Sequence, residues 1–258
     1  MTILVLGGTA EARQLAGELA ELPLRVISSL AGRVRNPALP AGEVRVGGFG
    51  GIDGLARWVR AEGVQAVVDA THPFAETISA HAAEACDRAG VPLLRLARPG
   101  WERKDGDDWH DAQSLEDAAA MLPGLGARVF LTTGRQGLAA FAGLDMLWFL
   151  IRCVDPPAGP LPARREVLLS RGPYVREAER ALMQQFAIDV LVTKNSGGPL
   201  TACKLAAARD LGVPVVMVRR PAAVAGPSSA ATVGDAVSWV LGQARAPGGP
   251  VPAGSSGE

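Results

Sequence analysis

The chain has 258 residues, enough to bury a substantial core in one large domain or two small ones. Lysine plus arginine and aspartate plus glutamate number 26 each, so no net charge attracts nucleic acid or an anionic lipid surface. The apolar runs are far shorter than the roughly 20 residues that span a membrane, and no signal-peptide pattern precedes the first strand. The three cysteines are widely spaced, without the spacing of a metal site or a disulfide framework. We therefore expect a cytoplasmic protein.

The first part of the chain alternates short apolar runs with segments of helical periodicity. Continuous apolar strands separated by helices are typical of a parallel sheet covered on both faces, so we predict an α/β fold. The predicted strands are 2–6, 24–28, 43–47, 65–70 and 91–97, and the predicted helices lie near 10–21, 53–62 and 74–89.

A polar segment, residues 98–113, has neither periodicity, and we interpret it as the connection between two domains. We predict two Rossmann-like parallel-sheet domains, residues 1–98 and 99–245, and a disordered tail, residues 246–258, that is rich in Gly, Pro and Ser. The predicted strands of the second domain are 128–133, 145–154, 166–170, 189–193 and 214–219, with helices near 114–122, 135–141, 174–187, 200–211 and 232–243.

Polar residues and glycines gather where the predicted strands end. Ligands bind outside the carboxyl ends of the strands in open parallel sheets, so two such edges predict an active site in a cleft between the domains. Ordinary turns use the same residue types, but seven such loops in succession favour a ligand site. The loops read GGTAEAR, SSLAGR, GGFGG and THP in the first domain, and TTGR, SRGPY and TKNSGG in the second.

The first loop is a variant of a dinucleotide-binding turn. Counted as G-x-G-x-x-G/A, its positions are Gly7, Thr9 and Ala12, so a threonine stands where the middle glycine is usual. Gly7 and Gly8 allow a tight turn, and Thr9 is a good helix N-cap that leaves N–H groups to face a phosphate. Glu11 would repel a pyrophosphate placed against the first turn, so taken alone the motif is a weak signal.

The end of the second strand favours NADP over NAD. An NAD site places Asp or Glu roughly 20 residues past the glycines, to bind the ribose 2′-hydroxyl. Here the residues are Ser28 and Ser29, followed by Arg33 and Arg35. Hydroxyls and a guanidinium suit a 2′-phosphate, although the arginines could also be solvated loop residues.

Three residues are candidates for proton transfer. Lys194 is one of only three lysines in an arginine-rich chain and follows a strand, in the loop TKNSGG. His72, in DATHPF, could donate a proton, orient a ligand or cap the next helix, and Tyr174, in SRGPY, could be an acid or a pocket wall. Ser170 has no G-x-S-x-G elbow and no assignable triad around it.

Eight blocks carry a resemblance to a known family: LVLGGTAEAR, SSLAGRVRNPALP, VRVGGFGG, VVDATHPFA, VFLTTGR, WFLIR, LLSRGPY and LVTKNSGG. In these blocks and their order, from residue 2 to about residue 220, the chain resembles the precorrin-6A reductases of the aerobic cobalamin pathway. The resemblance implies two Rossmann-like domains with the active site between them. It also implies hydride transfer from NADPH to a ring double bond of precorrin-6A, giving precorrin-6B.

The resemblance and the strand-end pattern together give a set of expected site residues. Basic side chains at strand ends would meet the acetate and propionate groups of the substrate, and the proton donor would be Lys194, His72, Tyr174 or water. We expect the cofactor to contact Gly7, Gly8, Thr9, Ser28, Ser29, Arg33, Gly48, Thr71 and His72. We expect the substrate to contact Arg95, Arg98, Thr133, Gly134, Arg135, Ser170, Arg171, Gly172, Lys194, Asn195, Ser196 and Gly197.

Several alternatives stay open at this point. The substrate could instead be the cobalt-containing counterpart of the anaerobic branch or another polyanionic small molecule. A non-enzymatic protein that senses NADP through a Rossmann domain is the alternative from another class. We expect a small-molecule tetrapyrrole as partner, no nucleic acid, no membrane and no metal site, and the chain is compatible with a monomer.

Overall fold

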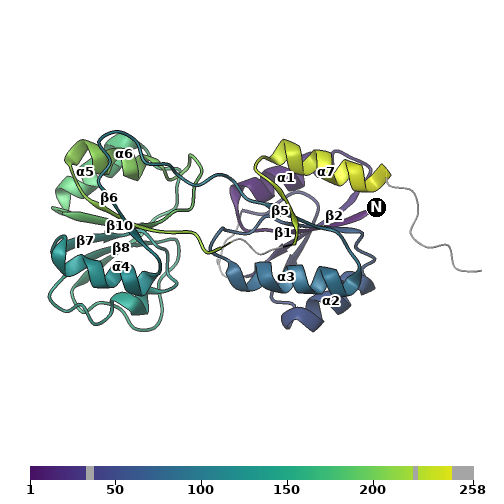
Figure 1. Cartoon of the computed structure of the whole chain (residues 1–258), viewed down its shortest axis with the longest axis horizontal. Helices are drawn as coiled ribbons and strands as arrows, with labels where there is room; N and C mark the ends of the chain where they lie inside the picture. The colour runs from purple at the N-terminus through teal and green to yellow at the C-terminus, as the bar shows by residue number, and fades with distance from the viewer. Residues whose placement is uncertain (33–37, 223–225, 246–258) are drawn as a thin grey trace, which may run out of the picture. The chain divides into compact units, whose positions relative to one another are not determined.

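The computed structural model of the chain describes residues 1–32, 38–222 and 226–245, which form two compact units (Figure 1). The first unit contains residues 1–32, 38–97 and 226–245, and the second contains residues 98–222. The predicted tail, 246–258, lies outside the described residues, as does Arg33. No helix in the described part of the chain combines the length and the apolar character needed to cross a bilayer.

The first unit is built on a six-stranded parallel sheet in the order β3-β2-β1-β4-β5-β12. Side chains alternate between its faces, so Ile3 and Val5 pack against helices α1 and α7, whereas Leu4 and Leu6 pack against α2 and α3 (Figure 1). The strands are β1 (Thr2–Leu6), β2 (Arg25–Leu30), β3 (Glu43–Val46), β4 (Ala66–Asp69), β5 (Leu93–Leu96) and β12 (Ser228–Ala230), and the helices are α1 (Ala10–Ala20), α2 (Gly51–Ala61), α3 (Glu76–Ala89) and α7 (Val233–Arg245).

The second unit repeats this plan with a six-stranded parallel sheet in the order β9-β8-β7-β10-β11-β6. Helices α5 and α6 cover the face that carries Phe130, Leu191 and Met217, and α4 lies on the other face (Figure 1). The elements are β6 (Trp109–Ala112), α4 (Leu115–Met121), η1 (Leu122–Gly124), β7 (Arg128–Leu131), η2 (Leu138–Phe141), β8 (Trp148–Cys153), β9 (Arg165–Leu169), α5 (Arg176–Gln185), β10 (Val190–Lys194), α6 (Cys203–Leu211) and β11 (Val215–Val218).

Both sheets have the strand order of a Rossmann fold, so the predicted α/β class with two parallel-sheet, Rossmann-like domains is confirmed. In each sheet the two central strands are the pair between which the chain changes its direction across the sheet. These pairs are β1–β4 and β7–β10. The loops after them form the topological switch point, where such folds bind ligands.

The sixth strand of each sheet comes from an unexpected part of the chain. β6 follows β5 in sequence but pairs with β11, and β12 follows β11 but pairs with β5. The predicted second domain, 99–245, therefore needs a correction, because β12 and α7 belong to the first unit. The exchange was hidden because β6 and β12 are short, polar strands, WHDA and SSA, within segments that lack an apolar run.

Candidate functional site

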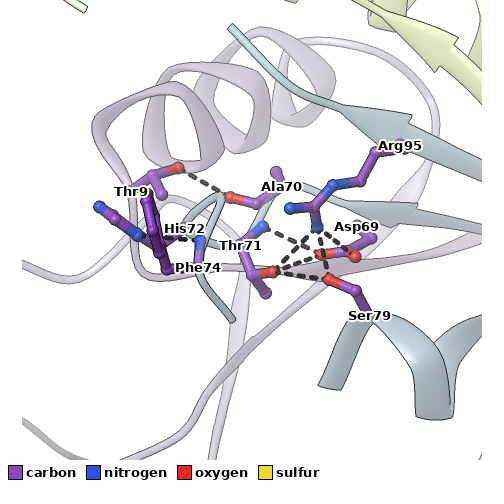
Figure 2. Close-up of polar contacts among 8 residues, drawn as sticks. All are labelled: Thr9, Asp69, Ala70, Thr71, His72, Phe74, Ser79 and Arg95. Atoms are coloured by element: carbon purple, nitrogen blue, oxygen red, sulfur yellow. Dashed lines mark hydrogen bonds and ion pairs between the residues drawn. The ribbon is translucent and has the colours of Figure 1, made fainter. Parts of the chain in front are cut away.

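At the first switch point, the Thr9 side chain connects the two loops. Its hydroxyl donates to the backbone carbonyl oxygen of Ala70, after β4, at 2.8 Å (Figure 2). The same hydroxyl accepts from the backbone N–H of Ala12 at 3.1 Å. The predicted N-cap is therefore confirmed, and the same oxygen ties the loop after β1 to the loop after β4. Threonine at this position replaces the usual glycine with a fixed hydrogen-bonded joint.

The turn before Thr9 leaves room for a ligand at the start of α1. The Gly7 N–H donates to the Ser29 carbonyl oxygen at 2.9 Å, which anchors the turn to β2. Gly8 has φ = +116°, is exposed, and a Cβ built there would meet no atom within 4 Å. A positive φ with open space in front of a helix N-terminus is the geometry that lets a backbone approach a phosphate.

The end of β2 carries hydroxyls and a neighbouring guanidinium. Parallel pairing sets Arg45 of β3 beside Ser29, and its Nη1 lies 3.2 Å from the Ser29 hydroxyl oxygen. The guanidinium also donates to the carbonyl oxygens of Gly47 at 2.7 Å and Gly48 at 2.6 Å, and stacks 3.7 Å from the Phe49 ring centre. Sequence reasoning selected Arg33 and missed Arg45, because only the strand register brings Arg45 next to Ser29.

Ser28 adds an unused donor at the same edge. Its side chain is 1 % exposed, and its hydroxyl oxygen has no hydrogen-bond partner among the described residues. A buried hydroxyl normally finds a partner, so this atom is an observation in favour of a polar ligand near the end of β2. No carboxylate follows in the sequence before residue 43 that would reject a phosphate.

A buried ionic network supports the loop after β4 (Figure 2). Asp69 is 2 % exposed and forms an ion pair with Arg95 of β5. Asp69 Oδ1 accepts from the Thr71 N–H at 3.1 Å and the Thr71 hydroxyl at 2.7 Å, and Arg95 Nη1 lies 3.0 Å from Thr71 Oγ1 and 2.8 Å from Ser79 Oγ. The arrangement favours a positioning role for Arg95 over the substrate contact predicted for it.

His72 stands directly after this network. Its Nδ1 accepts from the Phe74 N–H at 3.3 Å, and its ring centre is 5.8 Å from that of Phe74. Because Nδ1 acts as an acceptor, the neutral imidazole carries its proton on Nε2. His72 is half-buried, so this ring retains the access that a proton donor or a ligand-orienting group requires.

The second switch point presents a similar edge. Thr133, Gly134 and Arg135 follow β7, and Lys194 ends the neighbouring β10. Thr133 is 7 % exposed, and its hydroxyl has no hydrogen-bond partner within the part of the chain that the structure describes. Arg135 and Lys194 are both half-buried. Cationic groups and an unused hydroxyl at one sheet edge suit an anionic ligand.

The loop after β10 is fastened to the segment that enters the unit. The Asn195 side chain accepts from the Trp101 N–H at 2.7 Å and donates to the Trp101 carbonyl at 3.1 Å. Arg220 donates to four backbone carbonyls, those of Arg98, Pro99, Asn195 and Ser196, at 2.7–3.1 Å. Sequence reasoning missed Arg220, which follows β11 in an ordinary polar turn.

Close approach of the chain explains the glycines of this loop. Gly197 has φ = +67°, and a Cβ there would lie 2.0 Å from the Pro99 carbonyl oxygen. Gly198 has φ = +78°, and its Cβ would lie 3.0 Å from Arg98 Cδ and Nε. The Arg98 Nε donates to the Ser196 carbonyl at 2.8 Å. The sequence reading expected Gly197 to contact the substrate, whereas the structure shows both glycines against residues 98–99.

The loop after β9 lies at the same edge of the sheet, on the far side of β8. It contains Ser170, Arg171 and Gly172, and the Tyr174 hydroxyl donates to the Ser170 carbonyl oxygen at 3.0 Å. The Arg152 guanidinium lies 3.9 Å from the Tyr174 ring centre. Tyr174 is thereby held as part of the loop, while Arg171 is exposed to solvent.

Behind Tyr174, charged side chains are buried in the unit. Arg152 and Glu179 are 7 % and 2 % exposed and form a bidentate pair at 2.5 and 3.0 Å. Lys204, on α6, is 4 % exposed. The sequence reading did not select these residues, although Lys204 shares a helix face with the buried Ala207 and Ala208. Among the described residues, no three His, Cys, Asp or Glu side chains are grouped to hold a metal ion.

Comparison with known proteins gives a consistent result. The family model described as "Precorrin-6x reductase CbiJ/CobK" matches residues 2–241. A precorrin-6A reductase from Rhodococcus erythropolis is 56% identical over 239 residues, covering 92% of this chain and 96% of the relative. A solved structure titled "CobK precorrin-6A reductase" has a TM-score of 0.88 and 40% identity, covering 94% of this chain and 97% of that one. A cobalt-precorrin-6A reductase from Salmonella typhimurium is 30% identical, covering 85% of this chain and 87% of the relative.

Proposed function

The chain belongs to the precorrin-6x reductase family, CbiJ/CobK, and on this premise we propose that it reduces precorrin-6A to precorrin-6B with NADPH as the hydride donor. The observation that carries the proposal is the extent of the match, 56% identity to a precorrin-6A reductase over 96% of that protein's length. The family match spans residues 2–241, a range that includes both sheets and the loops that follow their strands.

The nucleotide side of the proposal rests on the first unit. The N-terminus of α1 and the open backbone at Gly8 fit a pyrophosphate, and Thr9 fixes that turn. Ser29 and Arg45 fit a 2′-phosphate, and the sequence adds Arg33 to this group. When bound, NADPH supplies the hydride, while the chain provides orientation and electrostatics.

The substrate side rests on the second unit. A precorrin carries several carboxylates, and Arg135, Arg171 and Lys194 are cations at strand ends that suit them. Thr133 offers a buried hydroxyl that has no partner among the described residues. Asn195 and Arg98 contribute indirectly, because their side chains hold the loop after β10 in shape.

The reduction also adds one proton to the macrocycle. His72 offers an Nε2–H, Lys194 an ammonium and Tyr174 a phenol, with water as the remaining source. All four are candidates for the proton donor. Holding the two reactants in near-attack geometry is the main contribution expected of the chain, worth on the order of 7–11 kcal/mol.

The metal-free substrate is favoured over its cobalt counterpart. Identity to the precorrin-6A reductase of Rhodococcus is 56%, whereas identity to the cobalt-precorrin-6A reductase of Salmonella is 30%. The experiment is anaerobic turnover of the purified protein with each tetrapyrrole and either NADPH or NADH, followed by absorbance. We expect a changed tetrapyrrole spectrum and NADPH consumption with precorrin-6A. Tight NADPH binding without oxidation would instead support a nucleotide sensor.

A further inference from the structure

Lys204 is buried against an aromatic ring instead of reaching solvent. Its Nζ lies 4.5 Å from the centre of the Trp101 ring and donates to the Thr201 carbonyl oxygen at 3.0 Å. An ammonium over an indole face is the strongest arrangement of the cation–π type, and its energy grows when water is excluded. With 4 % of its surface exposed, Lys204 meets that condition.

Trp101, which contacts Lys204, is also hydrogen-bonded to the loop after β10. Its indole N–H donates to the Gly198 carbonyl at 2.8 Å, and its backbone N–H and C=O are both bonded to the Asn195 side chain, at 2.7 and 3.1 Å. One residue thus connects the buried ammonium with both ends of the segment 195–198. Lys194 and Ser196, expected substrate contacts, adjoin Asn195 in the chain.

We propose that Lys204 is a positioning residue that holds Trp101 against the loop 194–201 and so keeps that loop in the shape that binds the substrate. The proposal rests on the proposed function, because it assigns the loop to substrate binding. Lys204 itself does not touch the reacting atoms; it acts through Trp101 and the Thr201 carbonyl.

The charges around Lys204 make this support sensitive to pH. Burial, and next the Arg152 guanidinium on β8, lower the pKa of Lys204 to about 7, while Glu179 on α5 and Cys203 beside it act in the opposite direction. Above that pH the amine is neutral and loses its attraction to the indole. The environment of the Trp101 ring should therefore change as the pH rises through neutrality.

The first test needs no substrate, and it uses variants only to assign signals of the wild-type protein. The chain has three lysines, Lys104, Lys194 and Lys204, so NMR of protein labelled at the lysine side chains gives three signals to titrate. We expect the Lys204 signal, identified by its loss in Lys204→Met, to titrate close to neutral pH. We expect the Trp101 indole signal, identified by Trp101→Phe, to shift with the same midpoint. A Trp101 signal that ignores the Lys204 titration would overturn the proposal.

The second test is kinetic. Lys204→Met should raise KM for precorrin-6A about tenfold with little change in kcat or in NADPH affinity. Lys204→Arg keeps a cation and should recover part of the loss, and the exposed Lys104→Met is the matched control that should behave as wild type. A folded Lys204→Met with wild-type KM at every pH would overturn the proposal. A wild-type protein that shows the coupled NMR titration but no turnover would instead contradict the proposed function alone.

Discussion

The Thr9 hydroxyl donates to the Ala70 carbonyl oxygen at 2.8 Å, which joins the two loops of the first switch point through one side chain (Figure 2). The same oxygen caps α1. The N-terminus of α1 and the loop after β4 are therefore positioned by the same side chain. A ligand phosphate at α1 would meet a backbone that is already ordered.

Removal of this joint should affect both stability and nucleotide binding. Thr9→Val keeps the shape but loses the cap and the bond to Ala70, so we expect the free energy of unfolding to fall by about 1–3 kcal/mol. NADPH affinity, measured by fluorescence titration, should fall as well. Ser114→Ala removes the corresponding cap of α4 in the other unit and should lower stability only. Equal NADPH affinity in Thr9→Val and wild type would show that the Thr9–Ala70 hydrogen bond does not contribute to nucleotide binding.

Removing one charge of the Asp69–Arg95 pair should lower the free energy of unfolding more than replacing both residues by apolar ones. Asp69→Asn leaves the half-buried Arg95 guanidinium without its counter-ion, so we expect a loss of up to about 3 kcal/mol in urea unfolding. The double variant Asp69→Leu with Arg95→Met removes both charges and should cost less than the sum of the single changes. Asp53→Asn, in the exposed pair with Arg88, is the control and should leave the free energy of unfolding nearly unchanged. Additive costs at positions 69 and 95 would show that the two charges do not interact.

Arg45 should select between the two nicotinamide cofactors. A charge-assisted contact with the 2′-phosphate is worth about 1.5–3 kcal/mol, so Arg45→Ala should weaken NADPH about 10- to 100-fold. The same variant also loses its bonds to the Gly47 and Gly48 carbonyls, but that damage reduces NADH affinity equally. The ratio of the two affinities therefore isolates the phosphate contact. Arg57→Ala, an exposed change on α2, serves as control. An unchanged ratio in Arg45→Ala would leave Arg33 as the residue to test next.

Lys204 should give the folded chain a pH-dependent stability. The pKa is about 7 in the folded chain and 10.5 for an ordinary lysine, so between these values the unfolded chain binds more protons. Stability should rise with pH across this window, by up to about 1.4 kcal/mol per pH unit. Below it both forms are protonated, and the contribution to the slope vanishes. The measurement is the difference between wild type and Lys204→Met in urea unfolding at several pH values, which cancels other groups. A difference that is flat between pH 7 and 10.5 would contradict the lowered pKa.

The sequence predicted the features that local pattern controls. The apolar strands and the loops that follow them lie where expected, because strand period and turn composition act over a few residues. Thr9 was recognised as a cap for the same reason. The reaction was predicted from the family resemblance, because hydrophobic periodicity carries no information about chemistry.

Contacts between distant parts of the chain could not be predicted in this way. β12 and β6 are polar and short, so nothing local marked them as sheet strands that exchange between the units. Arg45 and Arg220 owe their positions to strand register and to a turn more than 120 residues from Arg98. For Lys204 a local signal did exist, since a lysine on the apolar face of a helix indicates a buried charge.

Transfer of deuterium tests the central claim most directly. The purified chain would be incubated anaerobically with precorrin-6A and NADPH that carries deuterium at nicotinamide C4, in each of its two stereoisomers, and the tetrapyrrole product analysed by mass spectrometry. We predict one deuterium in precorrin-6B from one stereoisomer only, with matching oxidation of NADPH. A reduced tetrapyrrole without deuterium from either stereoisomer, or deuterated NADPH that stays unoxidised, would contradict direct hydride transfer by this protein.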